Sequence, residues 1–230
     1  MNDKIWNNWT NGWKWIMTVA ENRKWDLEPI EIKEKIQVSQ VETLQKALKI
    51  SYPSDFTYIL INYSSGVKFG WQITTEETQG EFRPIFCGCG GISNYRAKSN
   101  LWDFDGLAEL YETYQGWLTD CYNDPTDEYG MHYYDKIPFI EVPNGDLIVF
   151  DLKGHVIYLS HDDGPLHGAK LADNFIEFIS LWSNIGCVGT ESEQFAVFYD
   201  EVNQKLMDVD PKIDRWKQWL TNNYSTQHQV

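Results

Sequence analysis

The sequence predicts an α+β fold in which a mostly antiparallel sheet has helices before it and after it. Helical periodicity dominates the N-terminal part of the chain, apolar runs separated by tight turns fill the middle, and helical periodicity returns near the end. Strands and helices are therefore grouped along the chain, whereas a parallel sheet requires them to alternate. Gly88–Gly91 is followed by neither Lys-Ser/Thr nor a suitable helix start, so it is not a phosphate-binding loop. These observations argue against a doubly wound nucleotide-binding sheet.

The first predicted element is an N-terminal helix rich in tryptophan. Five of the 11 tryptophans lie in the first 25 residues. Apolar residues recur there at helical spacing and form one face; they are Ile5, Trp6, Trp9, Trp13, Ile16, Met17 and Ala20. We expect this helix to dock on the main core. A partner-binding arm and a membrane-interface helix are the alternatives, and the Asn-rich polar face argues against the second.

Two more helices are predicted after a linker at residues 25–37. Ser39 and Glu42 have the spacing of a capping box at the start of the first helix. Pro53 follows the end of that helix and can open the next one, because a proline in the first turn removes no needed hydrogen bond. Gly66 is expected to end this second helix in a left-handed conformation.

Strands are predicted at residues 67–73 and 81–86, with a glycine-rich corner at 88–91 after them. A long helix follows, since apolar residues keep a 3.6-residue period from Leu107 to Cys121. Asp103 or Asp105 is the expected cap of this helix. Residues 123–135, rich in Asp, Gly and Tyr, are expected to form a loop.

The clearest strand signal is a three-stranded meander between residues 137 and 160. Asn144-Gly145 separates the apolar runs 137–142 and 147–152, and Asn-Gly in this setting is the strongest short-range indication of a hairpin. Lys153-Gly154 makes a second tight turn into the third strand.

The last part of the chain is predicted to be helical. Asp173 is the expected cap of a helix through Trp182 that ends at 186–189, and another helix is expected near 191–205. Asp210-Pro211 opens the last helix, and we expect the tail from Thr221 to fray.

Composition and charge exclude several classes of protein. The 230 residues are 42% hydrophobic, 15% aromatic and 23% charged, as in a globular domain. The net charge of −15 repels phosphate backbones and favours a basic partner. No apolar run approaches the roughly 18 residues of a membrane span, and no signal-peptide core is present. Four scattered cysteines do not form a disulfide framework, which favours a cytoplasmic location.

Catalytic and metal-binding motifs are weak in this sequence. Cys87-Gly-Cys89 is a single pair, whereas a structural zinc site typically uses two pairs. His155, His161 and His167 are spaced by six residues, and of these only His161 and His167 can converge, together with Asp162 and Asp163. We interpret this segment as a polar loop, with metal or acid–base chemistry as the alternative. The sequence therefore predicts no catalytic residue, no metal and no cofactor.

The most informative feature is an acidic segment. Residues 101–135 contain nine Asp and Glu residues and no Lys or Arg, and Asp162 and Asp163 follow later. Tyrosines lie among these acids, as in many interfaces, although they can equally pack the loop onto the core. A solvated acidic face is the alternative to a docking surface for a basic protein. The partner contacts predicted here are Asp120, Asp124, Asp127, Glu128, Tyr129, Tyr133, Asp135, Asp162 and Asp163.

Three segments then occur in a familiar order: YPSDFTYILINYSSG, IPFIEVPNGDLIVFDLKGHVIYLSHDD and LADNFIEFISLW. Together they resemble the SMI1/KNR4 family of the SUKH superfamily, over residues 36–182. Ser65 stands where asparagine is usual, and Asn174 where serine is common. The residues that match are Tyr52, Pro53, Asp55, Phe56, Gly66, Ile137, Pro138, Phe139, Gly145, Asp146, Phe150, Asp151, Leu171, Ala172, Phe175, Phe178 and Trp182.

The resemblance implies an α+β fold with a mostly antiparallel sheet and no catalysis. Bacterial members look like immunity proteins that neutralise polymorphic toxins, often nucleases, and fungal members resemble regulators of cell-wall synthesis. We expect a Trp-rich helical extension at residues 1–35, an SMI1/KNR4-like domain at 36–190 and a C-terminal helical extension at 191–230 packed on the core.

The leading hypothesis is a cytoplasmic immunity protein that binds a basic toxin domain through the acidic residues. A regulatory or scaffold protein without a toxin partner is the alternative, followed by a metal-dependent hydrolase that uses His161, Asp162, Asp163 and His167. Neither a nucleic acid nor a membrane is expected as a partner. Reversing the charges of Asp124, Asp127 and Glu128 is expected to slow association with the toxin.

Overall fold

A computed structural model describes residues 3–74, 77–89 and 100–222 of the chain. Its helices are α1 (Asp3–Asn22), α2 (Val38–Leu48), α3 (Ser54–Asn62), α4 (Leu107–Asp120), α5 (Phe175–Asn184), α6 (Ser192–Ala196) and α7 (Pro211–Asn222). Its strands are β1 (Asp26–Ile32), β2 (Gly66–Gln72), β3 (Cys87–Cys89), β4 (Asn100–Asp103), β5 (Ile137–Glu141), β6 (Leu147–Phe150), β7 (Val156–Leu159), β8 (Lys170–Ala172), β9 (Tyr199–Asp200) and β10 (Lys205–Leu206). The predicted α+β class is confirmed. Among the described helices, none is both long and apolar enough to cross a membrane.

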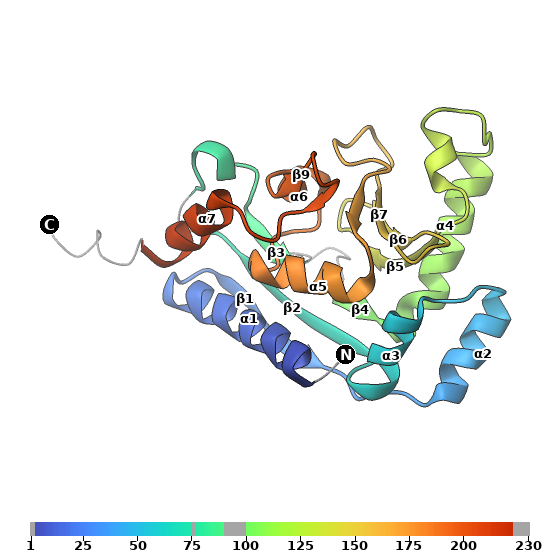
Figure 1. Ribbon diagram of the computed structural model, residues 1–230, viewed down its shortest axis with the longest axis horizontal. Coiled ribbons are helices and arrows are strands. Elements are labelled where there is room, and N and C mark those ends of the chain that lie inside the picture. Colours follow the sequence, from blue (N-terminus) through green and yellow to red (C-terminus); the bar gives the residue numbers. More distant parts are fainter. Residues whose placement is uncertain (1–2, 75–76, 90–99, 223–230) are drawn as a thin grey trace, which may run out of the picture.

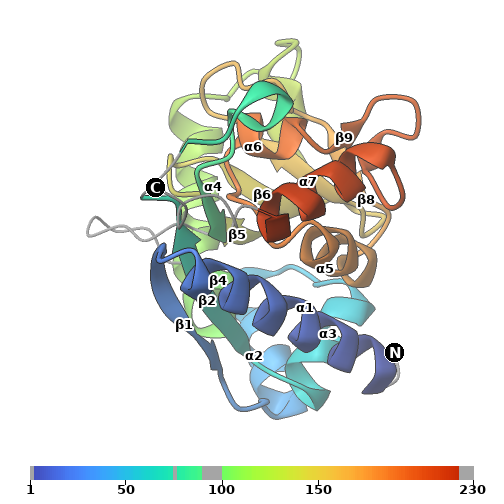
Figure 2. The ribbon, with the colours of Figure 1, turned by 90° about the vertical axis from the view of Figure 1, so that its left-hand side faces the viewer.

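The strands form two four-stranded antiparallel sheets and a short hairpin. In the first sheet β2 pairs with β1 on one side and with β3 and β4 on the other, and the second sheet has the order β5-β6-β7-β8. Helix α1 runs along the first sheet, and α5 crosses the middle of the molecule (Figures 1 and 2). Helix α4 covers the face of the second sheet that points away from α5. There Leu110 and Tyr114 form a cluster with Val149 and Leu159.

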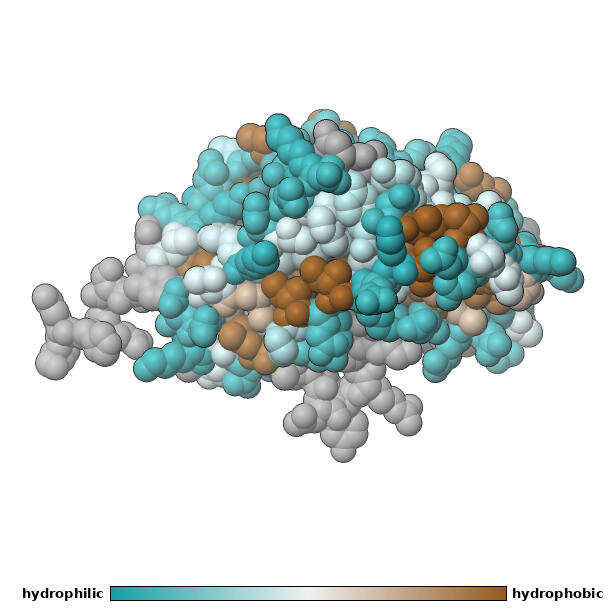
Figure 3. Space-filling view, turned by 90° about the horizontal axis from the view of Figure 1, so that it is seen from below, coloured by the Kyte–Doolittle hydropathy of each residue, from teal (hydrophilic) through white to brown (hydrophobic). Residues whose placement is uncertain are grey.

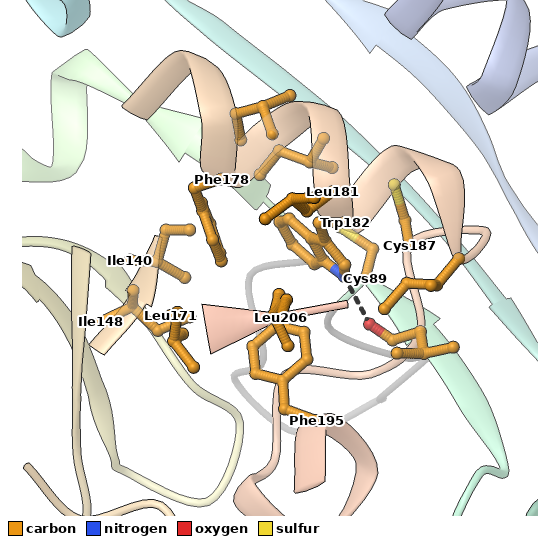
Figure 4. Packing of buried hydrophobic residues seen from close by; sticks show 14 of the residues in the cluster. Cys89, Ile140, Ile148, Leu171, Phe178, Leu181, Trp182, Cys187, Phe195 and Leu206 are labelled. Atoms are coloured by element: carbon orange, nitrogen blue, oxygen red, sulfur yellow. Dashed lines mark hydrogen bonds between the residues drawn. The ribbon is translucent and has the colours of Figure 1, made fainter. Parts of the chain in front are cut away.

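One large hydrophobic cluster joins helices from both ends of the chain. It runs from Trp9 and Trp13 of α1 through Phe56 and Phe175 to Leu220 of α7. Figure 4 shows its central part, where Phe178 and Trp182 of α5 pack with Phe195 and the Trp182 indole donates to the Val188 carbonyl at 2.7 Å. Residues of all three predicted segments, 1–35, 36–190 and 191–230, therefore share one core.

The tryptophan-rich N-terminal helix packs on this core, as predicted. Trp9 and Trp13 are buried, and their indole nitrogens donate to the hydroxyls of Ser180 and Ser183 at 2.8 and 3.0 Å. A buried tryptophan needs a partner for its single donor, so these bonds fix the position of α1 along α5. On the face seen in Figure 3, apolar side chains form separate patches among hydrophilic ones.

The predicted linker at residues 25–37 is wrong in part, because residues 26–32 form strand β1. Most β1 side chains are exposed, so the strand lacks the alternation of apolar and polar residues that identifies a half-buried strand. Proline is tolerated at position 29 because β1 lies at the edge of the sheet, where one row of its backbone groups faces no other described strand.

Two predicted end signals are also wrong, the capping box of α2 and the glycine end of α3, whereas Pro53 stands directly before α3 as its N-cap residue. The N-cap of α2 is Gln37, whose backbone N–H donates to the Gln40 side chain at 2.9 Å, so Ser39 and Glu42 are not its capping box. Gly66 does not end α3 but begins β2. A Cβ at Gly66 would lie 3.0 Å from the Lys33 side chain and 3.2 Å from the Trp102 carbonyl oxygen, so this glycine serves close strand packing.

The strand predicted at 81–86 is wrong. A 3₁₀ turn, η1 (Gly80–Phe82), occupies its start, and the extended segment begins only at Cys87. The apolar residues that suggested a strand are instead anchors of a loop, since Phe82 and Ile85 are buried. The strand predicted at 67–73 is confirmed as β2, and residues 90–91 of the glycine corner lie outside the described residues.

The meander is confirmed, with both turns of one type. Gly145 and Gly154 have φ of 99° and 86°, and each closes a three-residue loop whose flanking residues are hydrogen-bonded. Only a residue that adopts positive φ cheaply can stand at these positions. A fourth strand, β8, pairs with β7 and was not predicted, because three residues are too short for a periodic pattern.

Two expectations about the C-terminal part are wrong. Asn174, not Asp173, caps α5, since its side chain accepts from the Glu177 N–H at 2.9 Å. The helix expected near 191–205 is limited to the five residues of α6, after which β9 and β10 form a hairpin. Helix α7 begins at Pro211 as predicted, and residues 223–230 of the tail lie outside the described residues.

Candidate protein-binding surface

Helix α4 carries the first part of the acidic segment. Asp103 accepts a hydrogen bond from the Asp105 N–H at the start of the 3₁₀ turn η2 (Phe104–Gly106), which leads directly into α4. Leu110 and Tyr114 face the second sheet, so the helical period places Glu112 and Asp120 on the exposed side. The core pattern of the helix therefore decides which way its acids point.

Three tyrosines attach the loop after α4 to the end of β7. The hydroxyls of Tyr129 and Tyr133 donate to the Ser160 carbonyl oxygen at 2.6 and 2.7 Å, and that of Tyr122 donates to the His161 carbonyl at 2.8 Å. Tyr122 and Tyr133 are stacked with ring centroids 4.0 Å apart. These contacts draw the two acidic segments predicted from sequence, 120–135 and 162–163, to the same end of the molecule.

The predicted contact role of Tyr133 needs correction, whereas that of Tyr129 stays a prediction. Tyr133 is only 1% exposed, so its side chain is not accessible to a partner and supports the surface from beneath. Tyr129 is half-buried, and its ring is stacked on His167 with centroids 3.6 Å apart. Packing of the loop onto the core, the alternative considered for these aromatics, is what the structure shows.

The predicted acids are all exposed: they are Asp120, Asp124, Asp127, Glu128, Asp135, Asp162 and Asp163. We call these seven residues the acidic surface. Two of them also build the loop, because Asp124 accepts from the backbone and hydroxyl of Thr126 and Asp127 accepts from the Gly130 N–H at 2.6 Å. The bonds from Thr126 hold the pKa of the Asp124 carboxyl below its usual range.

Beneath this surface lies a buried carboxylate that sequence reasoning did not select. Asp146 is 1% exposed. One of its oxygens accepts from the backbone and ring nitrogens of His161 at 2.8 and 2.6 Å, and the other accepts from Tyr158 and Asn144 at 2.7 and 2.9 Å. Burial acts to raise the pKa of Asp146, but these four donors outweigh it and the pKa is lowered.

Asp146, His161 and Asp162 are also the group of side chains, among the described residues, whose ligand atoms lie close enough to share a metal ion. The four residues considered from sequence do not converge, since His167 turns away from His161 towards Tyr129. Asp146 has four hydrogen bonds to its two oxygens, so the arrangement is complete as a structural network. The sequence signal for this role of Asp146 was its position directly after Asn144-Gly145, where a carboxylate can anchor the turn.

Two of the cysteines, Cys87 and Cys187, are held in unreactive surroundings. Cys87 and Cys187 are buried. Burial raises the pKa of the Cys87 thiol to about 12 and raises the pKa of the Cys187 thiol as well. Such thiols are inert as nucleophiles at neutral pH. The group of possible metal ligands in the described part of the chain includes neither of them.

His167 holds the acidic loop through a single tautomer. The Ser160 N–H donates to Nδ1 at 3.1 Å, so Nδ1 must be unprotonated, and Nε2 lies 3.0 Å from the Tyr129 carbonyl oxygen, to which it donates. Burial lowers the pKa of His167, and the neighbouring His132 acts in the same direction. Protonation of Nδ1 would remove the bond from Ser160.

This arrangement predicts a dependence of stability on pH. The pKa of His167 is lower in the folded than in the unfolded chain, so the unfolded chain binds more protons below the ordinary value of 6.5. Its contribution to stability is therefore present above pH 6.5 and is lost as the pH falls. Urea unfolding of the wild type and of His167→Gln, measured between pH 7.5 and 5, should show that the free energy of unfolding falls less with pH in the variant. An equal dependence of this free energy on pH in the two proteins would contradict the role given to His167.

Comparison with known proteins identifies a family but no individual relative. The family model described as SMI1 / KNR4 family (SUKH-1) matches residues 35–181, which include the second sheet, α4 and the whole acidic surface. Searches of curated proteins and of solved structures found no match.

Proposed function

Because the chain belongs to the SMI1/KNR4 family (SUKH-1), we propose that it is a bacterial immunity protein that binds and neutralises a cognate toxin. SUKH domains are commonly immunity proteins, and the family is generally non-catalytic. The toxin is of the nuclease type, and binding takes place in the cytoplasm, where such a toxin would act. The protein works by direct contact through the acidic surface.

The observation that carries this proposal is the supported acidic surface. Four of its exposed carboxylates stand on the loop after α4, and three tyrosine hydroxyls attach this loop to the backbone of residues 160–161, next to Asp162 and Asp163. A surface that is already ordered loses little conformational entropy on binding. Its carboxylates match the basic surface that a nuclease needs for phosphate backbones, and complementary charge accelerates association.

The toxin partner is tested by titration calorimetry with the toxin domain encoded beside the gene. We expect tight binding that weakens by roughly tenfold or more between low and high salt, because screened surface charges attract less. Salt-insensitive tight binding would keep the immunity function and contradict the acidic surface as its interface. Absence of binding at micromolar concentration would contradict the pairing and favour the regulatory or scaffold function.

A further inference from the structure

One imidazole joins the loop after α4 to the end of β7. We call residues 121–135, which carry four carboxylates of the acidic surface, the acidic loop. His167 accepts from the Ser160 N–H at Nδ1 (3.1 Å) and donates from Nε2 to the Tyr129 carbonyl oxygen (3.0 Å). Its ring lies flat on the Tyr129 ring, with centroids 3.6 Å apart and an angle of 2° between the planes. A single side chain therefore binds the backbone on both sides of the contact between the acidic loop and the second sheet.

These bonds require a neutral His167. The Ser160 N–H can only donate, so it needs an unprotonated Nδ1 as its acceptor. Ser160 is buried, so water does not replace that acceptor while the loop is in place. A proton on Nδ1 would therefore leave a buried N–H group without a partner and would put a positive charge in a half-buried position.

The aromatic groups that face His167 give a positive charge no compensation by an opposite charge. The His132 ring stands edge-on to the His167 ring, with centroids 5.1 Å apart. It is packed against Gly168, where a Cβ would overlap the His132 ring. A second imidazolium at this distance would repel the first. Tyr129 and Tyr133 stay uncharged, because burial raises the pKa of both hydroxyls.

Carboxylates act in the opposite direction but do not prevail. Asp146, in the β5–β6 turn, favours a charged His167, although its oxygens already accept four hydrogen bonds. Asp162 and Asp163 lie between Ser160 and His167 in the chain, and both are exposed to solvent, which screens their charges. Burial and His132 outweigh Asp146, so the pKa of His167 is lowered.

Opening of the acidic loop would relieve this conflict without unfolding the molecule. Tyr122, Tyr129 and Tyr133 pack in the smaller hydrophobic cluster, which is separate from the large cluster that contains α1 and α5. Segments with few buried apolar contacts open at the lowest free energy. The open form exposes His167 and the Ser160 N–H to water, so it takes up a proton that the closed form excludes.

We propose that His132 and His167 form a pH-sensitive latch: in weakly acidic solution the acidic loop leaves the end of β7, and a basic partner bound to it is released. The release rests on the proposed function, because it needs a partner on the acidic surface, whereas the opening of the loop does not. The latch goes beyond that function by making binding depend on pH.

The opening is tested without a partner, by amide hydrogen exchange of the full chain at pH 7.5 and 5.5, corrected for the intrinsic effect of pH on exchange. Below the ordinary histidine pKa of 6.5, opening gains up to about tenfold for each pH unit. We therefore expect the acidic loop to lose protection by about fivefold to tenfold, while α5 keeps its protection. Unchanged protection of the loop, or an equal loss in α5, would overturn the latch.

Two variants identify the group that takes up the proton. His167→Gln keeps a donor and an acceptor in the side chain but does not titrate, so its loop should be protected equally at both pH values. His155→Gln is the matched control, since His155 pairs with Asp151 at the opposite end of β7, and it should behave like the wild type. A loss of protection in His167→Gln as large as in the wild type would overturn the proposal.

Titration calorimetry with the toxin domain at the same two pH values measures the release. The affinity of the wild type should fall by about fivefold to tenfold more than that of His167→Gln. An equal fall in the two proteins would overturn the release. Absence of toxin binding at either pH would instead contradict the proposed function, and the exchange experiment would still decide whether the latch exists.

Discussion

Replacing Asp146 by asparagine is expected to lower the free energy of unfolding by about 2–4 kcal/mol, a large part of the stability of an ordinary domain. The carboxylate is buried and accepts four hydrogen bonds that join the β5–β6 turn, β7 and His161, the second residue after β7. It is thus the point at which the second sheet and the support of the acidic surface meet.

An amide cannot reproduce these bonds, because one of its two ends donates. If the NH₂ group faces His161, it meets the backbone N–H there, which cannot change its role. If it faces the other side, it meets the NH₂ group of Asn144, whose amide oxygen already accepts from the Asp146 N–H at 3.0 Å. In either orientation a buried donor loses its acceptor.

Urea unfolding at pH 7 measures this loss, with Asp163→Asn as the control. Asp163 is exposed and has a φ of 54°, which asparagine also adopts readily, so the same chemical change there should cost less than about 0.5 kcal/mol. Equal unfolding midpoints for the two variants would contradict the structural role of Asp146. Because the pKa of Asp146 is lowered on folding, its stabilisation is present above the usual range of a carboxyl and is lost as the pH falls through the folded value.

The parts of the fold that the sequence predicts well are those whose signal is local. Gly145 and Gly154 identify their turns because the backbone there requires positive φ. Helix α4 was predicted because its apolar residues extend over enough turns to show the 3.6-residue period. Strand β1 was missed because its exposed side chains follow no alternation. Its place as a strand comes from pairing with β2, a contact over about 40 residues of sequence that no local pattern records.

The acidic surface was predicted by counting charges, but the tyrosine contacts that hold it in place were not predicted. Nine acids in one segment are visible in the sequence, whereas the bonds from Tyr122, Tyr129 and Tyr133 to residues 160–161 depend on tertiary contacts. The same holds for Asp146, whose partners come from three different turns and strands.

The second large effect is expected from charge reversal on the acidic surface. Asp124 and Asp127 are poor positions for it, because their carboxylates hold the loop together. Asp120 and Glu128 are exposed, and among the described residues their carboxylates have no hydrogen-bond partner. The double variant Asp120→Lys, Glu128→Lys should therefore keep the fold and lower the association rate with a basic toxin domain by about tenfold or more at low salt.

A matched control removes the effect of net charge itself. Glu21→Lys with Asp214→Lys changes the net charge by the same four units, at exposed positions of α1 and α7. These helices lie at the opposite end of the molecule from the loop after α4 (Figure 1). The control should slow association far less, because the attraction between exposed charges falls off over roughly 10 Å at moderate salt.

The central claim, that the acidic surface binds the toxin, is tested most directly by stopped-flow association of the toxin domain with these three proteins at low and high salt. We predict that wild type and control associate rapidly and slow down with salt, whereas Asp120→Lys, Glu128→Lys associates slowly and depends less on salt. Equal association rates and equal salt dependence for the two double variants would show that the toxin binds elsewhere on the protein.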